Sequence, residues 1–500
     1  MPGLRLIARH WGLPALLGGI SVFGFAPFYL FPIPIFSLAA LFFLLRKSGP
    51  GSALPASYAF GLGWFLAGVS WVYVSLHDYG AMPMPLAGLA TLLAAAFLAI
   101  FPALAMWLTM SLAMRWQVTA RVRWLVLAPV FWSLLEWVRD WLLTGFPWQA
   151  IGYAQAPYSP LAGYAAVLGV FGVSWLSALT AGALSLLPGA VFRHKLEMLL
   201  LVLAVWLGGY GLARIEWTHA LGEPVSVSLL QGNVAQEMKF NPDKLADTLI
   251  RYRRMIQEST ARLIVTPETA APVMLDALPA DYLNSLAAHA RQQGGDLLLG
   301  VPERLADGRY FNSMVSLGSA PPQTYRKVHL VPFGEFLPPG FGWIVTVLKI
   351  PLSNFSRGPV VQPPFTVAGQ RVAVNICYED VFGEELIHAL PEATMMANVS
   401  NDAWFGDSFA PWQHLQIAQM RALETRRWWL KANNTGITAI LDQQGRVVAR
   451  LAPFTTDALR GTAQGRGGAT PYVRGGNYPY LTLAFLALLL AAWLGRRSRP

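Results

Sequence analysis

A carboxylate, an ammonium group and a thiol each stand at the end of an apolar, strand-like stretch of this sequence. They are Glu268, Lys327 and Cys377, and the last is the only cysteine in the chain. α/β folds present reactive side chains at the ends of their strands. There a carboxylate can act as a base, a lysine can stabilise an oxyanion, and a thiolate can act as a nucleophile.

Each of the three also has an ordinary structural interpretation. Glu268 could be a helix N-cap or an ion-pair partner, Lys327 a solvated lysine of an edge strand, and Cys377 an inert core residue. A single cysteine forms no intramolecular disulfide, so cysteine usage leaves the redox compartment open. Taken singly, the residues do not decide between chemistry and structure.

These residues lie in a stretch of soluble character, 223–475, whose pattern alternates between strand and helix. Short aliphatic or β-branched runs bounded by turn residues predict strands at 225–230, 262–265, 296–300, 372–376 and 437–441. Periodic apolar residues predict helices at 243–258, 281–293 and 412–426. The stretch therefore predicts one α/β domain.

The rest of the chain is strongly apolar. Of 500 residues, 54% are hydrophobic and 13% charged, and this excludes an ordinary soluble protein and a disordered chain. The formal charge of +10 lies largely between apolar stretches, not in a basic stripe typical of nucleic-acid binding. Windows long enough to cross a bilayer predict eight spans, at 11–28, 30–45, 54–76, 85–114, 124–143, 161–187, 196–213 and 478–494.

The basic residues agree with this count, because they fall before the first span and after every second one. The positive-inside rule then places both termini in the cytoplasm and the α/β domain on the outer face, the periplasm of a bacterium. We expect a membrane domain with seven helices at 1–221, a periplasmic domain at 222–475, and a final helix with a basic tail at 476–500. The loop and tail residues that carry this argument are Arg5, Arg9, Arg46, Lys47, Arg115, Arg121, Arg123, Arg193, Lys195, Arg496, Arg497 and Arg499.

Three short motifs, taken together, resemble the nitrilase, or carbon–nitrogen hydrolase, superfamily. They are Thr-Pro-Glu at 266–268, Arg-Lys at 326–327 followed by Phe-Gly-Glu at 333–335, and Cys-Tyr-Glu at 377–379. The resemblance implies a four-layer αββα sandwich in which Glu268 is the general base, Lys327 stabilises the oxyanion and Cys377 is the nucleophile. It also implies supporting roles for Glu335, for the backbone N–H of Tyr378 and for Glu379.

Soluble nitrilases lack eight spans, and the whole arrangement resembles the apolipoprotein N-acyltransferase family. Leu-Gln-Gly-Asn at 230–233 and the segment 398–405 agree with it. The resemblance implies an enzyme of the bacterial inner membrane without metal or cofactor. Its expected partners are membrane lipids, a phospholipid that donates its sn-1 acyl chain, phosphatidylethanolamine above all, and an apolipoprotein with an N-terminal diacylglyceryl-cysteine.

An apolar segment directly after the lysine motif, 337–351, suggests how a lipid reaches the site. Exposed apolar segments often contact membranes, so a lid that includes Phe341 and Trp343 is one interpretation and a buried helix the other. Phe240 stands where the family resemblance leads us to expect tryptophan. Asn401, Trp404 and Trp412 are candidates for the opposite wall, although aromatic residues are also ordinary core.

Three charged residues, Glu136, Arg139 and Asp140, interrupt the fifth span near its outer end. Such charges are costly at membrane depth, so they predict either a headgroup-binding or interdomain role or simple pairing. Two rival functions remain at this stage. A membrane-anchored amidase would use the same three residues with water as acceptor, and a transporter with an outer binding domain would leave the three motifs unexplained.

Overall fold

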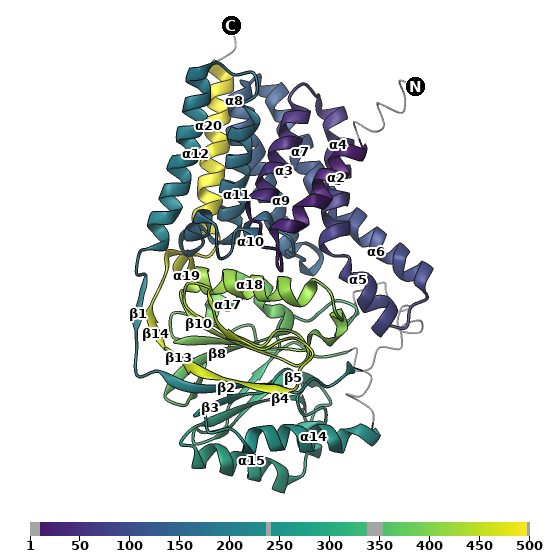
Figure 1. The fold of residues 1–500 in the computed structure, drawn as a ribbon, viewed down its shortest axis with the longest axis vertical. Coiled ribbons are helices and arrows are strands. Elements are labelled where there is room, and N and C mark those ends of the chain that lie inside the picture. Colours follow the sequence, from purple (N-terminus) through teal and green to yellow (C-terminus); the bar gives the residue numbers. More distant parts are fainter. Residues whose placement is uncertain (1–10, 237–241, 338–353, 498–500) are drawn as a thin grey trace. The chain divides into compact units, whose positions relative to one another are not determined.

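The computed structural model describes residues 11–236, 242–337 and 354–497, and these form two compact units (Figure 1). Unit 1 comprises the described parts of Met1–Tyr73, Met84–Ile215 and Arg474–Pro500. Unit 2 comprises Val74–Pro83 and the described parts of Glu216–Val473. A short piece of the N-terminal half thus belongs with the C-terminal unit.

Unit 1 is helical, as its apolar composition predicts. Its elements, with those that continue into unit 2 at either end, are α2 (Leu13–Ile20), η2 (Ser21–Gly24), α3 (Pro32–Leu45), α4 (Pro50–Gly68), α5 (Trp71–Val74), α6 (Met84–Leu98), α7 (Ile100–Trp116), α8 (Ala120–Val122), η4 (Arg123–Leu127), α9 (Ala128–Trp141), η5 (Leu142–Thr144), α10 (Ile151–Ala154), η6 (Pro160–Tyr164), α11 (Ala165–Ser185), α12 (Phe192–Ala213), α19 (Pro471–Gly475) and α20 (Tyr478–Arg497).

The helices long and apolar enough to cross a membrane are fewer than the sequence windows predict. Among the described residues there are four, Met84–Trp116, Pro160–Ser185, Phe192–Ala213 and Tyr478–Arg497. A fifth results if Pro50–Gly68 and Trp71–Tyr79, which are bent by 52° at a break, form one span. The first two predicted spans correspond to shorter apolar helices, Leu13–Gly24 and Pro32–Leu45. The predicted span 124–143 corresponds to the contiguous helical segments η4 (Arg123–Leu127) and α9 (Ala128–Trp141), which are not among these helices.

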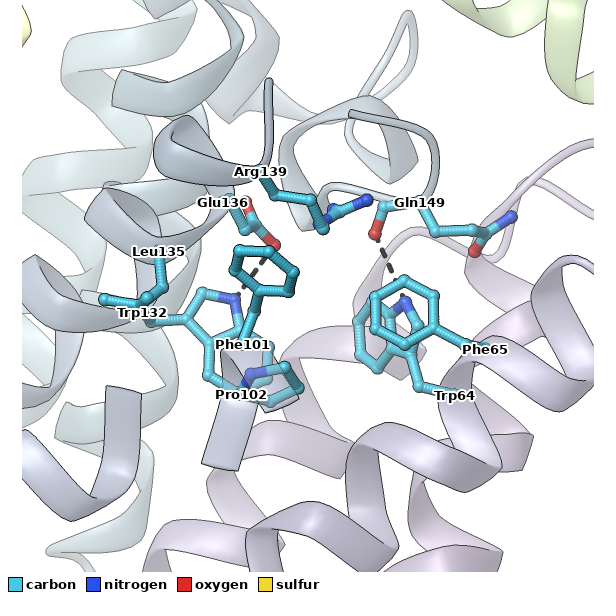
Figure 2. A pocket seen from close by; sticks show the side chains of 9 residues that line it. All are labelled: Trp64, Phe65, Phe101, Pro102, Trp132, Leu135, Glu136, Arg139 and Gln149. Carbon is cyan, nitrogen blue, oxygen red and sulfur yellow. Dashed lines mark hydrogen bonds between the residues drawn. The ribbon is translucent and has the colours of Figure 1, made fainter. Parts of the chain in front are cut away.

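The charged residues of α9 hold the loop that follows this helix. Arg139 donates from Nη1 to the carbonyl oxygens of Phe146 and Trp148 at 2.5 and 2.6 Å. Glu136 Oε1 accepts hydrogen bonds from Trp132 Nε1 at 3.0 Å and from the N–H of Ile151 at 2.9 Å. Both residues line a cavity of about 20 Å³, room for about one water (Figure 2). These hydrogen bonds of Arg139 and Glu136 lie within unit 1, and those to Phe146, Trp148 and Ile151 fasten the segment after α9.

The described part of unit 2 contains two six-stranded sheets and a two-stranded one. The first sheet has the order β13-β2-β3-β4-β5-β6 and the second the order β12-β11-β10-β9-β8-β7. The strands are β1 (Thr218–Ala220), β2 (Val225–Gln231), β3 (Leu263–Val265), β4 (Asp296–Arg304), β5 (Tyr310–Gly318), β6 (Thr324–Arg326), β7 (Phe365–Val367), β8 (Gln370–Ile376), β9 (Met395–Ser400), β10 (Trp428–Asn433), β11 (Ala439–Leu441), β12 (Val447–Arg450), β13 (Asp457–Ala463) and β14 (Arg466–Gly468).

The strands alternate between two apolar cores, which explains their nearly continuous burial. In β2, Val227 and Leu229 face a core shared with the second sheet, while Leu230 faces a core shared with α14 (Pro242–Gln257) and α15 (Ala280–Gln292). A third core joins the second sheet to α18 (Ala410–Thr425). The remaining short helices of unit 2 are η3 (Ser75–Tyr79), η7 (Leu275–Ala277), η8 (Cys377–Val381), α17 (Gly383–Leu386), η9 (Ile387–Ala389) and η10 (Asp402–Phe405).

The expectation of an α/β domain is confirmed, and each predicted strand and helix overlaps an observed one. The parallel pairs β2–β3–β4 and β8–β9–β10 form the centres of the two sheets. Because the carboxyl ends of parallel strands meet at one edge, residues that follow these strands come together there.

In unit 1, α2 and α4 cross at small residues, and this crossing generates a prediction. A methyl group added at Gly63 would overlap the backbone oxygen of Ala15, whereas one added at Gly51 of the same helix meets nothing within 4 Å. We expect Gly63→Ala to destabilise the detergent-solubilised protein by about 1–3 kcal/mol through overpacking. Gly51→Ala is the matched control and should be neutral or slightly stabilising. The measurement is the thermal midpoint of unfolding, and equal midpoints for the two variants would contradict the close crossing.

Candidate active site

Three different strands position the three candidate reactive residues. Glu268 follows β3, Lys327 directly follows β6 and Cys377 directly follows β8. The first two strands belong to one sheet and the third to the other. Lys327 Nζ lies 3.4 Å from Glu268 Oε1, and the charges of both residues act on the Cys377 thiol. The structure therefore brings the three together from positions far apart in the sequence.

The ammonium group of Lys327 is buried between two carboxylates. Its side chain is 1% exposed, and Nζ lies 2.8 Å from Glu335 Oε2 in addition to its contact with Glu268. Burial alone would lower the pKa of Lys327, but Glu335 and Glu268 outweigh burial and raise this pKa. The residue is a fixed cation, as an oxyanion-stabilising role requires.

Asn312, on β5, is a site residue that the sequence did not suggest. Its Nδ2 donates to Glu268 Oε1 at 2.6 Å and to Glu335 Oε1 at 3.0 Å. The two carboxylates thus share two donors, Asn312 and Lys327, and are held at fixed places. No motif marks Asn312, because an asparagine in the middle of a strand resembles any polar residue on a solvent face.

Cys377 has a backbone conformation that non-glycine residues rarely adopt. Its φ is +54°, at the point where β8 turns into η8. Burial and the negative charge of Glu268 raise the pKa of the Cys377 thiol well above its ordinary value, with Lys327 acting in the opposite direction. The thiol is therefore protonated at rest, and a base must remove its proton before it can attack.

Glu379 fastens this strained turn to the segment that follows the lysine. Its Oε2 accepts from the N–H of Ile376 at 2.6 Å and from the Tyr325 hydroxyl at 2.9 Å. Its Oε1 accepts from the N–H groups of Val328 and His329 at 2.6 and 3.1 Å. Burial raises the pKa of Glu379 to about 7, and the backbone donors oppose that shift. One carboxylate thus connects the cysteine and lysine segments.

Asn401, one of the residues expected to contact substrate, is hydrogen-bonded to Glu268. Its backbone N–H donates to Glu268 Oε2 at 3.0 Å, and its side chain bonds Gln236 and Asn434. Trp404 follows in η10, where its carbonyl oxygen accepts from Ser75 Oγ at 2.8 Å. Ser75, which the sequence windows assign to the third span, belongs to unit 2.

Two of the other aromatic candidates, Trp412 and Tyr378, have contacts in the structure. Trp412 packs against the core shared by the second sheet and α18, and Arg450 lies 4.8 Å above its ring. These are the contacts of a core residue, the alternative left open for it. The ring of Tyr378 packs edge to face against Phe382. The predictions for Phe240, Phe341 and Trp343 fall outside the described residues.

A second cluster of buried charges lies next to the cysteine turn. Asp380 Oδ1 is 2.8 Å from His414 Nε2, and Asp380 Oδ2 is 3.2 Å from Lys431 Nζ. The other ring nitrogen of His414, Nδ1, is 3.1 Å from Asp402 Oδ1. Burial and the charge of Lys431 would lower the pKa of His414, but Asp380 and Asp402 together outweigh them and raise this pKa to about 9.

Among the described residues, no group of three or more histidine, cysteine, aspartate or glutamate side chains is arranged to hold a metal ion. The site consists instead of a thiol, two carboxylates and an ammonium group. This set suits nucleophilic acyl chemistry, in which a base activates the thiol and a cation stabilises the tetrahedral intermediate.

Comparison with known proteins decides the family. Residues 17–183 match the model of the apolipoprotein N-acyltransferase N-terminal domain, and residues 226–472 match that of the carbon-nitrogen hydrolases. The apolipoprotein N-acyltransferase of Nitrosomonas europaea is 54% identical, over 99% of each chain. The chain belongs to the apolipoprotein N-acyltransferase family. Two inferences from the sequence are thereby confirmed, the carbon–nitrogen hydrolase superfamily from the three motifs and the apolipoprotein N-acyltransferase family from the whole arrangement.

Further relatives in this family are similar along nearly their whole length. The apolipoprotein N-acyltransferase of Chromobacterium violaceum is 47% identical over 97% of this chain and 94% of its own. That of Ralstonia nicotianae is 45% identical over 97% of this chain and 93% of its own. The membrane part and the α/β part are thus matched together, as expected for one family and not for an unrelated fusion.

The raised pKa of His414 gives a prediction for stability. A histidine whose pKa rises from about 6.5 to about 9 on folding stabilises the folded state below pH 6.5, and this contribution is lost as the pH rises through 9. We expect the thermal midpoint of the solubilised wild type to fall by on the order of 5 °C over that interval. His414→Gln should show a smaller fall. Parallel pH profiles for the two proteins would contradict a charged His414.

Proposed function

We propose that this chain transfers an acyl group from a phospholipid to the α-amine of a diacylglyceryl-cysteine at the N-terminus of an apolipoprotein. The observation that carries the proposal is the buried Lys327 between Glu268 and Glu335, beside the only thiol of the chain. Membership of the family supports the choice of substrates. We infer that phosphatidylethanolamine is the donor and that its sn-1 chain is transferred.

In the first step, Glu268 takes the proton from the Cys377 thiol, and the sulfur attacks the ester carbonyl carbon of the phospholipid. The negative charge that forms on the carbonyl oxygen is stabilised by Lys327 and by the backbone N–H of Tyr378. The ester C–O bond then breaks, and the proton on Glu268 passes to the departing oxygen. The products are a lysophospholipid and a thioester on Cys377.

In the second step, the free amine of the acceptor attacks the thioester carbonyl carbon. A tetrahedral intermediate forms in the same oxyanion site, and its C–S bond breaks to give an amide. The proton lost by the amine passes through Glu268 to the sulfur, which regenerates the thiol. The reaction balances without metal or organic cofactor, and Glu335 and Glu379 act by holding Lys327 and the cysteine turn.

The expected membrane arrangement follows from this chemistry, because both substrates are lipids. We infer a multi-pass protein of the bacterial inner membrane with eight crossings, both termini in the cytoplasm and the catalytic domain, 222–475, in the periplasm as an αββα sandwich. The alternation of basic loops supports the orientation. The three cores of unit 2 support the layer order. The final helix and its basic tail, 476–500, complete the topology.

The substrate path is inferred from the apolar and aromatic residues near the motifs. Phe341 and Trp343 belong to the segment proposed as a lid, and Phe240, Asn401 and Trp404 to the walls. The hydrogen bond from Asn401 to Glu268 supports its place beside the acyl group. An entrance that admits lipid and excludes water would favour the amine over water as acceptor.

Intact mass spectrometry of the full chain in detergent tests this proposal. After incubation with dioleoyl phosphatidylethanolamine we expect one oleoyl adduct on wild type and none on Cys377→Ala. A synthetic diacylglyceryl-cysteine peptide should discharge the adduct, which should be stable in water. Lys327→Met should form it about 100-fold or more slowly, because the oxyanion loses its cation.

Two results would contradict the proposal. An adduct that water clears as fast as the peptide does would indicate a hydrolase, the amidase alternative. The second result is that wild type, shown to be folded by its thermal midpoint, forms no adduct with any phospholipid. This would exclude a phospholipid donor and favour the small-amide and transporter alternatives.

A further inference from the structure

The cluster of Asp380, His414, Asp402 and Lys431 has no part in the reaction as described. Two of its members nevertheless lie close in sequence to residues of the active site. Asp380 is in η8, three positions after Cys377, and Asp402 directly follows Asn401, whose N–H is bonded to Glu268. The histidine comes from α18 and the lysine from β10. Two helical turns and two larger elements therefore meet at one buried point.

The hydrogen-bonding pattern fixes the charge of the histidine. Both ring nitrogens face carboxylate oxygens, Nε2 that of Asp380 at 2.8 Å and Nδ1 that of Asp402 at 3.1 Å. Ionised carboxylates only accept hydrogen bonds, and a neutral imidazole has a single donor. Two such contacts therefore require the imidazolium form. With Lys431 included, the cluster holds two positive and two negative charges and is neutral.

Burial makes this cluster rigid. The side chains of His414, Asp380, Asp402 and Lys431 are each 1% exposed or less. Removing one partner of a buried ion pair leaves an uncompensated charge, which is strongly unfavourable. The two carboxylates consequently have little freedom to leave the ring between them.

A second connection runs from the same cluster to the cysteine itself. Lys431 Nζ donates to Asn398 Oδ1 at 2.6 Å, and Asn398 Nδ2 donates to the carbonyl oxygen of Cys377 at 3.0 Å. The cluster therefore holds the cysteine turn at two places, through Asp380 and through the Cys377 carbonyl. On the other side it holds the turn that presents the Asn401 N–H to Glu268.

We propose that His414 is a positioning residue, which as an imidazolium clamps the nucleophile turn at Asp380 to the base-holding turn at Asp402. The clamp fixes the thiol of Cys377 relative to the carboxylate of Glu268 without touching substrate. This inference rests on the proposed function for its role in acyl transfer. The clamp itself concerns only the thiol and its base.

The test compares His414→Gln with wild type and with His289→Gln as matched control. His289 lies on α15 of the same unit and bonds the carbonyl oxygen of Ser259. Full-length proteins in detergent are assayed for the single-turnover rate of acyl-adduct formation over a range of dioleoyl phosphatidylethanolamine concentrations. We expect His414→Gln to lower the maximal rate about 10- to 100-fold with an unchanged half-saturating concentration. The substitution alters the position of the Cys377 thiol relative to Glu268 and leaves binding of the phospholipid donor unchanged.

Alkylation of Cys377 by iodoacetamide provides a second readout that does not depend on the acyl donor. The chain has a single cysteine, so the rate reports this thiol alone. If the base no longer meets the thiol, alkylation at pH 7 should be slower than in wild type. A merely structural role would loosen the unit, expose the thiol and speed alkylation.

The outcomes separate the clamp from the proposed function. Wild-type rates in folded His414→Gln, or faster alkylation with a lowered thermal midpoint, would overturn the clamp. If wild type forms no acyl adduct, the proposed function fails, and the alkylation rates still decide the clamp. Should His414→Gln not fold, Asp402→Asn removes the same ion pair by a smaller change and must show the same pattern.

Discussion

The structure depends above all on the burial of one ammonium group among carboxylates. A lysine taken out of water is tolerated only with good partners, and loss of one partner of a buried pair costs about 3–5 kcal/mol. Lys327 has two such partners, Glu268 and Glu335, and Asn312 bonds both of them. To assemble this group, β3, β5 and β6 must lie in one sheet in the observed register. The strand arrangement that stabilises buried Lys327 is therefore also the one that assembles the candidate reactive residues.

The strained cysteine turn obeys a related constraint. A non-glycine residue at positive φ costs about 1–3 kcal/mol and persists only where its surroundings fix it. At Cys377 the surroundings are Glu379, which accepts hydrogen bonds from the N–H groups of Ile376 and Val328, and Asn398, which donates to the Cys377 carbonyl. Both are buried, so water does not compete for these bonds. These hydrogen bonds hold the backbone of the turn in this conformation.

Sequence reasoning succeeded where a residue's role is marked by its neighbours. Val225–Gln231 and Gln370–Ile376 are recognisable as strands because each has four aliphatic residues in a run of seven, and Cys377 is marked by its place at a strand end. Asn312 and His414 have no such marks, since their roles arise only when separate strands and helices meet. The eight predicted spans remain a prediction, because among the described residues only four helices, or five if a bent pair is one span, are long and apolar enough to cross a membrane. Apolar windows count composition and do not show where charged side chains find partners, as Arg139 of α9 does at the Phe146 and Trp148 carbonyls of the following loop.

The two buried charge clusters differ in a way that suits their roles. Glu268, Glu335 and Lys327 carry one excess negative charge, which together with burial keeps the Cys377 thiol protonated until a substrate carbonyl is present. Moving the proton from sulfur to Glu268 leaves the total charge of these three residues and Cys377 unchanged, and in the proposed reaction the negative charge then passes to an oxygen beside Lys327. The cluster of Asp380, His414, Asp402 and Lys431 is neutral and has no proton to exchange in the reaction. The cluster around Lys327 can therefore redistribute its charge during acyl transfer. The cluster around His414 holds the turns that keep the Cys377 thiol close to Glu268.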